Sequence, residues 1–280
     1  MTPLGNADIR AVQRPGIIGV VWLLRLLSAA CIAAPVNAVI QGSGITDFQR
    51  GDELLFEPGA TMLIEVLRTQ WKTLGGAARS SAWLTLVFAC LGLVWLSVLL
   101  VALSHQGRGG PLIARAVQHV PGFTLIGGVT LLAQGGVLAV AALTYAGLGD
   151  WSARWLNQPS VDMIWAALGV VALFCVLVLG VIQDLSRAAA VRCFFGPGRA
   201  LRHGIRHFSQ RPGAIAAGWS LRAVGSLGIV LAAAVCVERL HVEQPGSWRI
   251  LCVFGLHQIA VLALVALRAS WLAYTLRQVG

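Results

Sequence analysis

QRPGIIGVVWLLR, residues 13–25, places a basic corner directly before a long apolar run. Residues 210–222 read QRPGAIAAGWSLR, with Gln, Arg, Pro, Gly, Ile, Trp, Leu and Arg at the same positions as in the first stretch. Proline is well tolerated at the first position of a helix, and glycine helps the backbone to turn there. Each copy therefore predicts the start of a helix that enters a membrane from its basic side.

The composition of the chain predicts a membrane protein. It is 57% hydrophobic and 11% charged, whereas soluble domains carry about 25% charged residues. Crossing about 30 Å of hydrocarbon takes about 20 apolar residues in a helix. We therefore predict an all-α polytopic membrane bundle, a single transmembrane domain over residues 1–280. Its six spans are expected at 17–40, 82–103, 122–146, 161–183, 212–237 and 249–267.

The first span could be mistaken for a secretory signal peptide, and the stretch 34–38 is a faint cleavage signal. Its apolar tract is longer than the 7–15 residues, roughly, of a signal peptide's hydrophobic region. The second copy at 210–222 also indicates that this segment belongs to the fold. We expect the first span to be retained.

A third, weaker copy of the corner precedes the third span. RAVQHVPG at 115–122 is similar to RAVQRPG at 10–16, with one residue added. The three copies predict three helical-hairpin repeats with one orientation, because each copy precedes a span that starts on the same side. These αα-hairpins are expected at about 9–103, 112–183 and 199–276.

The segments before two of the corners predict amphipathic helices. In 199–211, Leu201, Ile205 and Phe208 fall on one helical face and the basic residues lie elsewhere; the segment 112–120 has the same pattern more weakly. Such helices lie in the plane of a leaflet, with their cations among lipid phosphates. Arg14, Arg202, Arg206 and Arg211 are the candidate headgroup contacts.

The long segment 41–81 leaves two interpretations open. Apolar residues recur near helical spacing at Met62, Leu63, Val66, Leu67 and Leu74, with Trp71 beside them. The segment is either a short amphipathic helix on the outer surface or a packed surface loop.

The charge distribution predicts the orientation of the chain. Lys and Arg are concentrated in the N-terminal segment, 104–121, 184–211 and the C-terminal tail, where the acidic residues are Asp8 and Asp184 alone. The positive-inside rule therefore places both termini in the cytoplasm. The expected partners are a bilayer with anionic lipids and other membrane protein subunits. Nucleic-acid binding would need a basic soluble module, and the sequence leaves no room for one.

Arg25 and Arg222 fall about 15 Å along their predicted helices, counted from Pro15 and Pro212 at 1.5 Å per residue. An arginine near mid-bilayer costs about 2.5–3.5 kcal/mol on insertion scales. Three interpretations stay open: the side chains extend to the inner headgroups, they bond to backbone carbonyls or helix ends, or they contact an anion. Asp184, at the cytoplasmic end of the fourth span, is the nearest acidic partner.

The motifs of common enzyme classes are missing from the sequence. The six cysteines form no CxxC pair, and His203 and His207 share a helical face but would need a third residue to hold a metal. Val224–Gly228 does not match the Gly-x-Ser-Gly of rhomboid-like proteases. QGRGG at 106–110 lacks the lysine of a phosphate-binding loop. We expect no catalytic residue, no metal and no cofactor.

The stretch DLSRAAAVRCFFGPGRALRHGIRHFSQRPG, residues 184–213, resembles a pattern in uncharacterised bacterial six-span membrane proteins. These are similar to the membrane domain attached to some glycerophosphodiester phosphodiesterases. The resemblance covers the second half of the chain well and the first half loosely. It implies a six-span fold in the bacterial inner membrane. It carries over no catalytic residue, because no phosphodiesterase domain accompanies the segment.

Two hypotheses of function follow. The first is a non-enzymatic integral membrane subunit or scaffold, part of a larger inner-membrane assembly. The alternative is a transporter or lipid-handling permease that contacts an anionic solute or lipid headgroup through Arg25 and Arg222.

Overall fold

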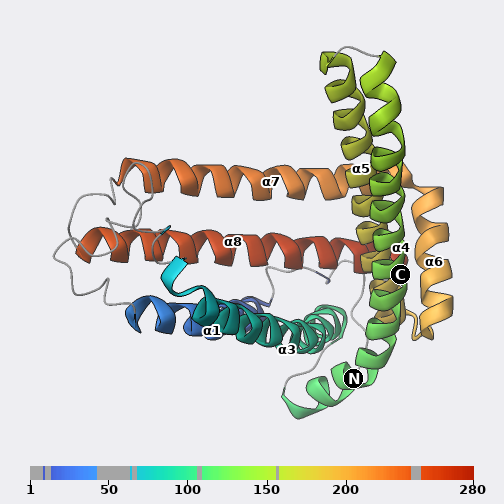
Figure 1. The fold of residues 1–280 in the computed structure, drawn as a ribbon. Helices are drawn as coiled ribbons and strands as arrows, with labels where there is room; N and C mark the ends of the chain where they lie inside the picture. The colour runs from blue at the N-terminus through green and yellow to red at the C-terminus, as the bar shows by residue number, and fades with distance from the viewer. Residues whose placement is uncertain are drawn as a thin grey trace. The chain divides into compact units, whose positions relative to one another are not determined.

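The computed structural model describes residues 9, 14–42, 64, 68–105, 109–155, 158–240 and 247–280. Within these ranges the architecture is helical, without strands (Figure 1). The helices are α1 (Pro15–Gly42), α3 (Trp71–Ser104), α4 (Gly110–Trp155), α5 (Gln158–Arg192), α6 (Pro197–Gln210), α7 (Pro212–Arg239) and α8 (Ser247–Val279).

Six of these helices are long and apolar enough to cross a membrane. The shortest candidate span has 25 residues and the longest has 38, which exceeds the roughly 20 residues that a bilayer requires. This is the helix inventory of a multi-pass membrane protein. The candidate spans are Pro15–Val39, Trp71–Ser104, Gly110–Gly147, Ser160–Arg192, Pro212–Arg239 and Trp248–Val279.

Two helices begin at the proline of the repeated stretch. α1 starts at Pro15 and α7 starts at Pro212. Proline is tolerated at this position because the N–H group that it lacks would have no hydrogen-bond partner within the helix. A separate 14-residue helix, α6, precedes α7, and Ala200 and Gly204 are its buried residues. The position of α6 in the plane of a leaflet stays a prediction, as does the threefold repeat.

The third corner differs from the expectation. α4 is one helix of 46 residues with Pro121 inside it, so the segment 112–120 is the first part of a longer helix and not a separate element. An internal proline removes one hydrogen bond and bends a helix without necessarily ending it. Figure 1 shows the first turns of α4 at an angle to the long remainder.

The second span also differs from its expected bounds. α3 already begins at Trp71, so the last part of the segment 41–81 is the start of a long helix. Met62, Leu63, Val66 and Leu67, on which the amphipathic interpretation of this segment depended, lie outside the described residues.

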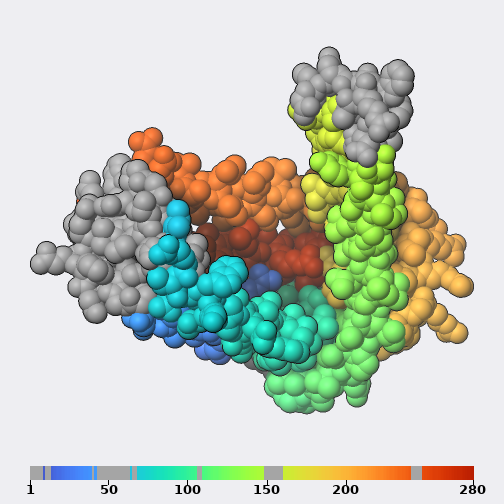
Figure 2. Space-filling view, viewed as in Figure 1, coloured from blue at the N-terminus to red at the C-terminus, as the bar shows by residue number. Residues whose placement is uncertain are grey.

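Helices α4, α5 and α6 pack against one another (Figures 1 and 2). Gly204 of α6 lies so close to α5 that a Cβ there would be 3.0 Å from the Ser186 backbone nitrogen and 3.1 Å from the Ile182 carbonyl oxygen. Small residues allow such close approach of helix backbones. Between α4 and α5, the Gln134 side chain donates to the Val176 carbonyl at 3.1 Å.

The contacts divide the chain into two units. The first contains Met1–Arg14, Ser97–Val224 and Arg268–Gly280, and the second contains Pro15–Leu96 and Gly225–Leu267. In the second unit, Ser81 of α3 donates to the Ile32 carbonyl of α1 at 2.8 Å. The polar contacts described below belong to the first unit. The single domain over 1–280 and its three hairpins stay a prediction.

Candidate functional site

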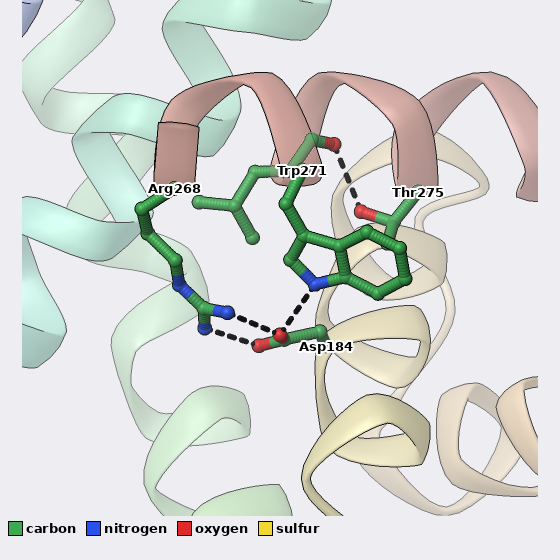
Figure 3. A network of polar contacts seen from close by, with 5 residues as sticks. Asp184, Arg268, Trp271 and Thr275 are labelled. Carbon is green, nitrogen blue, oxygen red and sulfur yellow. Dashed lines mark hydrogen bonds and ion pairs between the residues drawn. The ribbon is translucent and has the colours of Figure 1, made fainter. Parts of the chain in front are cut away.

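Asp184 lies near the C-terminal end of α5 and is 4% exposed. Arg268 of α8 donates to both of its oxygens, from Nη1 to Oδ2 at 2.6 Å and from Nη2 to Oδ1 at 2.7 Å (Figure 3). This paired geometry matches the planar guanidinium to the planar carboxylate. The side chain of Arg268 is 39% exposed, so the ion pair is buried on the Asp184 side and open on the other.

Trp271, also on α8, completes the surroundings of this carboxylate. Its indole Nε1–H donates to Asp184 Oδ2 at 2.8 Å, and the residue is 2% exposed. Arg268 and Trp271 are three residues apart, which puts their side chains on the same face of the helix. One turn further on, Thr275 donates to the Leu272 carbonyl at 2.8 Å (Figure 3). Asp184 thus accepts three hydrogen bonds from two adjacent turns of α8.

Arg222, the second arginine of the repeated stretch, is half-buried on α7. Its Nη1 donates to the Gly218 carbonyl of the same helix at 2.6 Å, and its Nε donates to Ser270 Oγ of α8 at 3.2 Å. The guanidinium carbon lies 5.0 Å from the ring centre of Tyr274 and 6.0 Å from that of Trp271. A cation over an aromatic face is favourable at these distances. The side chain therefore bridges two helices.

Glycine at position 218 makes this arrangement possible. A Cβ there would be 2.8 Å from the ring of Tyr274, closer than carbon atoms pack. Tyr274 in turn donates its hydroxyl to the Ala214 carbonyl at 3.0 Å, and its ring stacks on Trp271 with centroids 5.7 Å apart. Trp271 consequently contacts Asp184 through its N–H and Tyr274 and Arg222 through its ring.

Arg25 stands in a different setting from Arg222. It lies on α1 in the second unit, and its side chain is exposed. The two positions correspond in sequence, but the structure does not place them in equivalent surroundings.

The four candidate headgroup contacts fall into two groups. Arg14 is half-buried, and its Nη2 donates to the His105 carbonyl at 3.2 Å. Arg202 and Arg206 are exposed on α6, and the exposed Arg211 follows that helix directly. The latter three remain on the surface of the first unit, where an anionic lipid could reach them.

Several residues of these networks were missed by the sequence interpretation. Arg268 was assigned to the cytoplasmic tail, because the sixth span was expected to end at residue 267, whereas α8 continues to Val279. The sequence patterns do not single out Trp271. One signal could have found Arg268: Asp184 and Arg268 are charges of opposite sign within long apolar segments, and buried charges need partners.

The described residues contain no group of three His, Cys, Asp or Glu side chains that could hold a metal ion. His203 and His207 stack with ring centres 6.2 Å apart. Comparison with protein-family models, curated proteins and solved structures finds no match to this chain. The assignment of function therefore depends on the chemistry of the residues themselves.

Proposed function

We propose that this chain is a non-enzymatic integral membrane subunit, a scaffold within a larger inner-membrane assembly. The observation that carries the proposal is the Asp184 network. Both carboxylate oxygens accept hydrogen bonds from Arg268, and one accepts a further bond from Trp271. A carboxylate engaged in this way holds two helices together, and it is poorly placed to act as a catalytic acid or base.

The apolar surfaces of the long helices support the same proposal. On α7, Leu221 is 74% exposed and Val224 is 68% exposed, and on α4 Leu131 and Leu132 are 70% and 77% exposed. Within a membrane such surfaces contact either lipid or the helices of another subunit. Large exposed apolar surfaces are typical of interaction sites.

A transporter or lipid-handling permease was the alternative, with Arg25 and Arg222 contacting an anionic solute or headgroup. The geometry gives this alternative less support at Arg222, because its guanidinium already bonds to Gly218 and Ser270 and lies over Tyr274. Arg25 does not share these surroundings, so the two arginines do not form a matched pair.

The proposed location is the bacterial inner membrane, with both termini in the cytoplasm. The distribution of basic residues supports this orientation, and the resemblance of residues 184–213 to bacterial six-span proteins supports the inner membrane as the location. Exposed arginines on α6 suit a leaflet that contains anionic lipids. Reporter fusions at each terminus, active on one side of the membrane only, test the orientation.

The test of the scaffold proposal is isolation of the tagged full chain from native membranes in polymer nanodiscs, followed by native mass spectrometry. We expect assemblies larger than the 29.6 kDa chain, with other membrane proteins in fixed stoichiometry. Arg222→Gln should alter the assembly, and Arg211→Gln, at the exposed position just before α7, is the matched control. Isolation of the chain as a monomer without protein partners would contradict the proposal.

A further inference from the structure

The corner between α5 and α6 holds an exposed aromatic ring. Phe194 lies in this corner, and it is 58% exposed. The next residue, Phe195, is half-buried, and its ring centre lies 5.4 Å from that of His203 on α6. Two consecutive phenylalanines therefore have different surroundings. The ring of Phe195 packs against α6, and that of Phe194 is left largely open to whatever surrounds the protein.

The backbone of Phe194 adopts a conformation that costs free energy. Its φ is 54°, in the left-handed region that glycine usually occupies after the end of a helix. Among the described residues, Phe194 is the one residue other than glycine with a positive φ. Residues held in such conformations gather at functional sites. A phenylalanine that is exposed at a position suited to glycine indicates a contact of its ring outside the chain.

Phe194 lies where two candidate membrane spans end. One of these spans ends at Arg192, two residues before Phe194, and another ends at Ser104. His105 directly follows Ser104, and its ring centre lies 5.9 Å from that of Phe194. A membrane span ends where the apolar core of the bilayer meets the headgroups. The exposed ring therefore lies near the boundary between lipid and water, where aromatic side chains are enriched in membrane proteins.

Basic side chains accompany this ring. The guanidinium carbon of Arg115 on α4 lies 4.7 Å from the ring centre of Phe194, and Arg199 and Arg202 are exposed on α6 just after the corner. Residues 185–237 contain no Asp or Glu. An apolar ring among cations suits the surface of a leaflet with anionic lipids, because the ring enters between the headgroups and the cations meet the phosphates.

We propose that Phe194 anchors the α5–α6 corner to the bilayer, with its ring inserted between lipid headgroups. The partner of this surface is a lipid leaflet. Contact of the ring with the upper acyl chains removes apolar surface from water, and this gain offsets the cost of the left-handed backbone. The anchor fixes the depth at which α5 ends and α6 begins. It depends on the membrane-spanning class of the chain and not on its role as a subunit.

The first experiment places the photoreactive residue p-benzoylphenylalanine at position 194 of the full chain in native membranes. Irradiation joins its ketone to C–H bonds beside the ring, and mass spectrometry identifies the adduct. We expect a lipid adduct at position 194. The same residue at position 195 is the matched control and should react mainly within the chain, because the ring of Phe195 lies against His203. An adduct of position 194 to another protein, or adducts within the chain alone, would overturn the proposal.

Two variants separate the anchor from packing within the chain. Phe194→Gly suits the φ of 54° but removes the ring, whereas Phe194→Trp keeps a large ring. Amide hydrogen exchange of residues 192–196 in nanodiscs is the measurement. Exchange should rise about fivefold in Phe194→Gly and stay near the wild-type rate in Phe194→Trp.

The same measurement in an amphipathic polymer, which holds the protein without a bilayer, is the control. There the wild type and Phe194→Gly should exchange alike, because no leaflet is present to hold the ring. The proposal is overturned if Phe194→Gly exchanges no faster than the wild type in nanodiscs. It is also overturned if the two proteins differ as much in the polymer as in nanodiscs, since the ring would then act through contacts within the chain.

Discussion

Arg268 and Asp184, 84 residues apart in the sequence, form an ion pair with two hydrogen bonds of 2.6 and 2.7 Å. The pair joins the C-terminal part of α5 to the C-terminal part of α8. It does so in a chain with few charges, where each buried carboxylate must find its partner within the fold. Trp271 adds a third bond to the same carboxylate, so three hydrogen bonds should contribute to the stability of the protein.

Asp184→Asn should lower the free energy of unfolding by about 2 kcal/mol, because a half-exposed Arg268 loses its charged partner while the volume stays the same. Unfolding in mixed micelles with increasing SDS, followed by tryptophan fluorescence, measures the change. Glu238→Gln, at an exposed position near the end of α7, is the control and should change stability by less than about 0.5 kcal/mol. Equal effects of the two substitutions would contradict the structural role of Asp184.

Trp271→Phe should lower the free energy of unfolding by about 1–2 kcal/mol, since it removes the donor to Asp184 and keeps most of the ring. The same unfolding assay measures the effect. Trp248→Phe, at a residue that is 58% exposed, serves as the matched control. The Trp271→Phe and Asp184→Asn changes should be non-additive in the double variant, because they share one interaction; strict additivity would count against the hydrogen bond.

Gly204→Ala should loosen α6 from α5. The added Cβ would meet the Ser186 nitrogen and the Ile182 carbonyl oxygen at 3.0 and 3.1 Å, and backbone atoms cannot move aside as a flexible side chain can. Overpacking of this kind costs about 1–3 kcal/mol. Gly198→Ala on the same helix has open space around its Cβ and is the control. Hydrogen exchange of the α6 amides should rise in the first variant only.

The stability of the protein should depend on the protonation of His105. Burial, followed by the charge of Arg115 and then by Arg192 and His119, lowers the pKa of His105 from 6.5 to about 4. The ring of the unfolded chain takes up a proton below pH 6.5, whereas the folded ring does not until about pH 4. The stability should therefore fall as the pH decreases from 6.5 to 4, by up to about 3 kcal/mol from this group.

The His105→Gln variant isolates this contribution from the carboxylates that titrate in the same range. Its unfolding free energy should depend less steeply on pH between 6.5 and 4 than that of the wild type. Parallel pH profiles of the two proteins would show that His105 is not held neutral by its surroundings.

Some features of the fold could be predicted from single residues. Pro15 and Pro212 start α1 and α7, because proline accepts the first helical position and the apolar run then dictates a helix. The same argument predicts that a helix begins at Pro121, and this prediction is wrong because Pro121 lies inside α4. Whether a helix continues through a proline depends on the packing of the residues around it. The six candidate spans follow from apolar length alone.

The sequence by itself determined that the chain is helical, because backbone groups in an apolar setting must bond within their own segment. It also determined that α1 begins at Pro15 and α7 at Pro212. Only the tertiary structure decided which side chains meet. Three arrangements join residues that lie far apart in the chain. Asp184 pairs with Arg268, and Arg222 packs against Ser270 and Tyr274. His105 and Arg115 lie beside the ring of Phe194, and Arg187 lies over the ring of Phe123. Helical periodicity gives the face on which a side chain stands, and only packing determines what lies opposite to it.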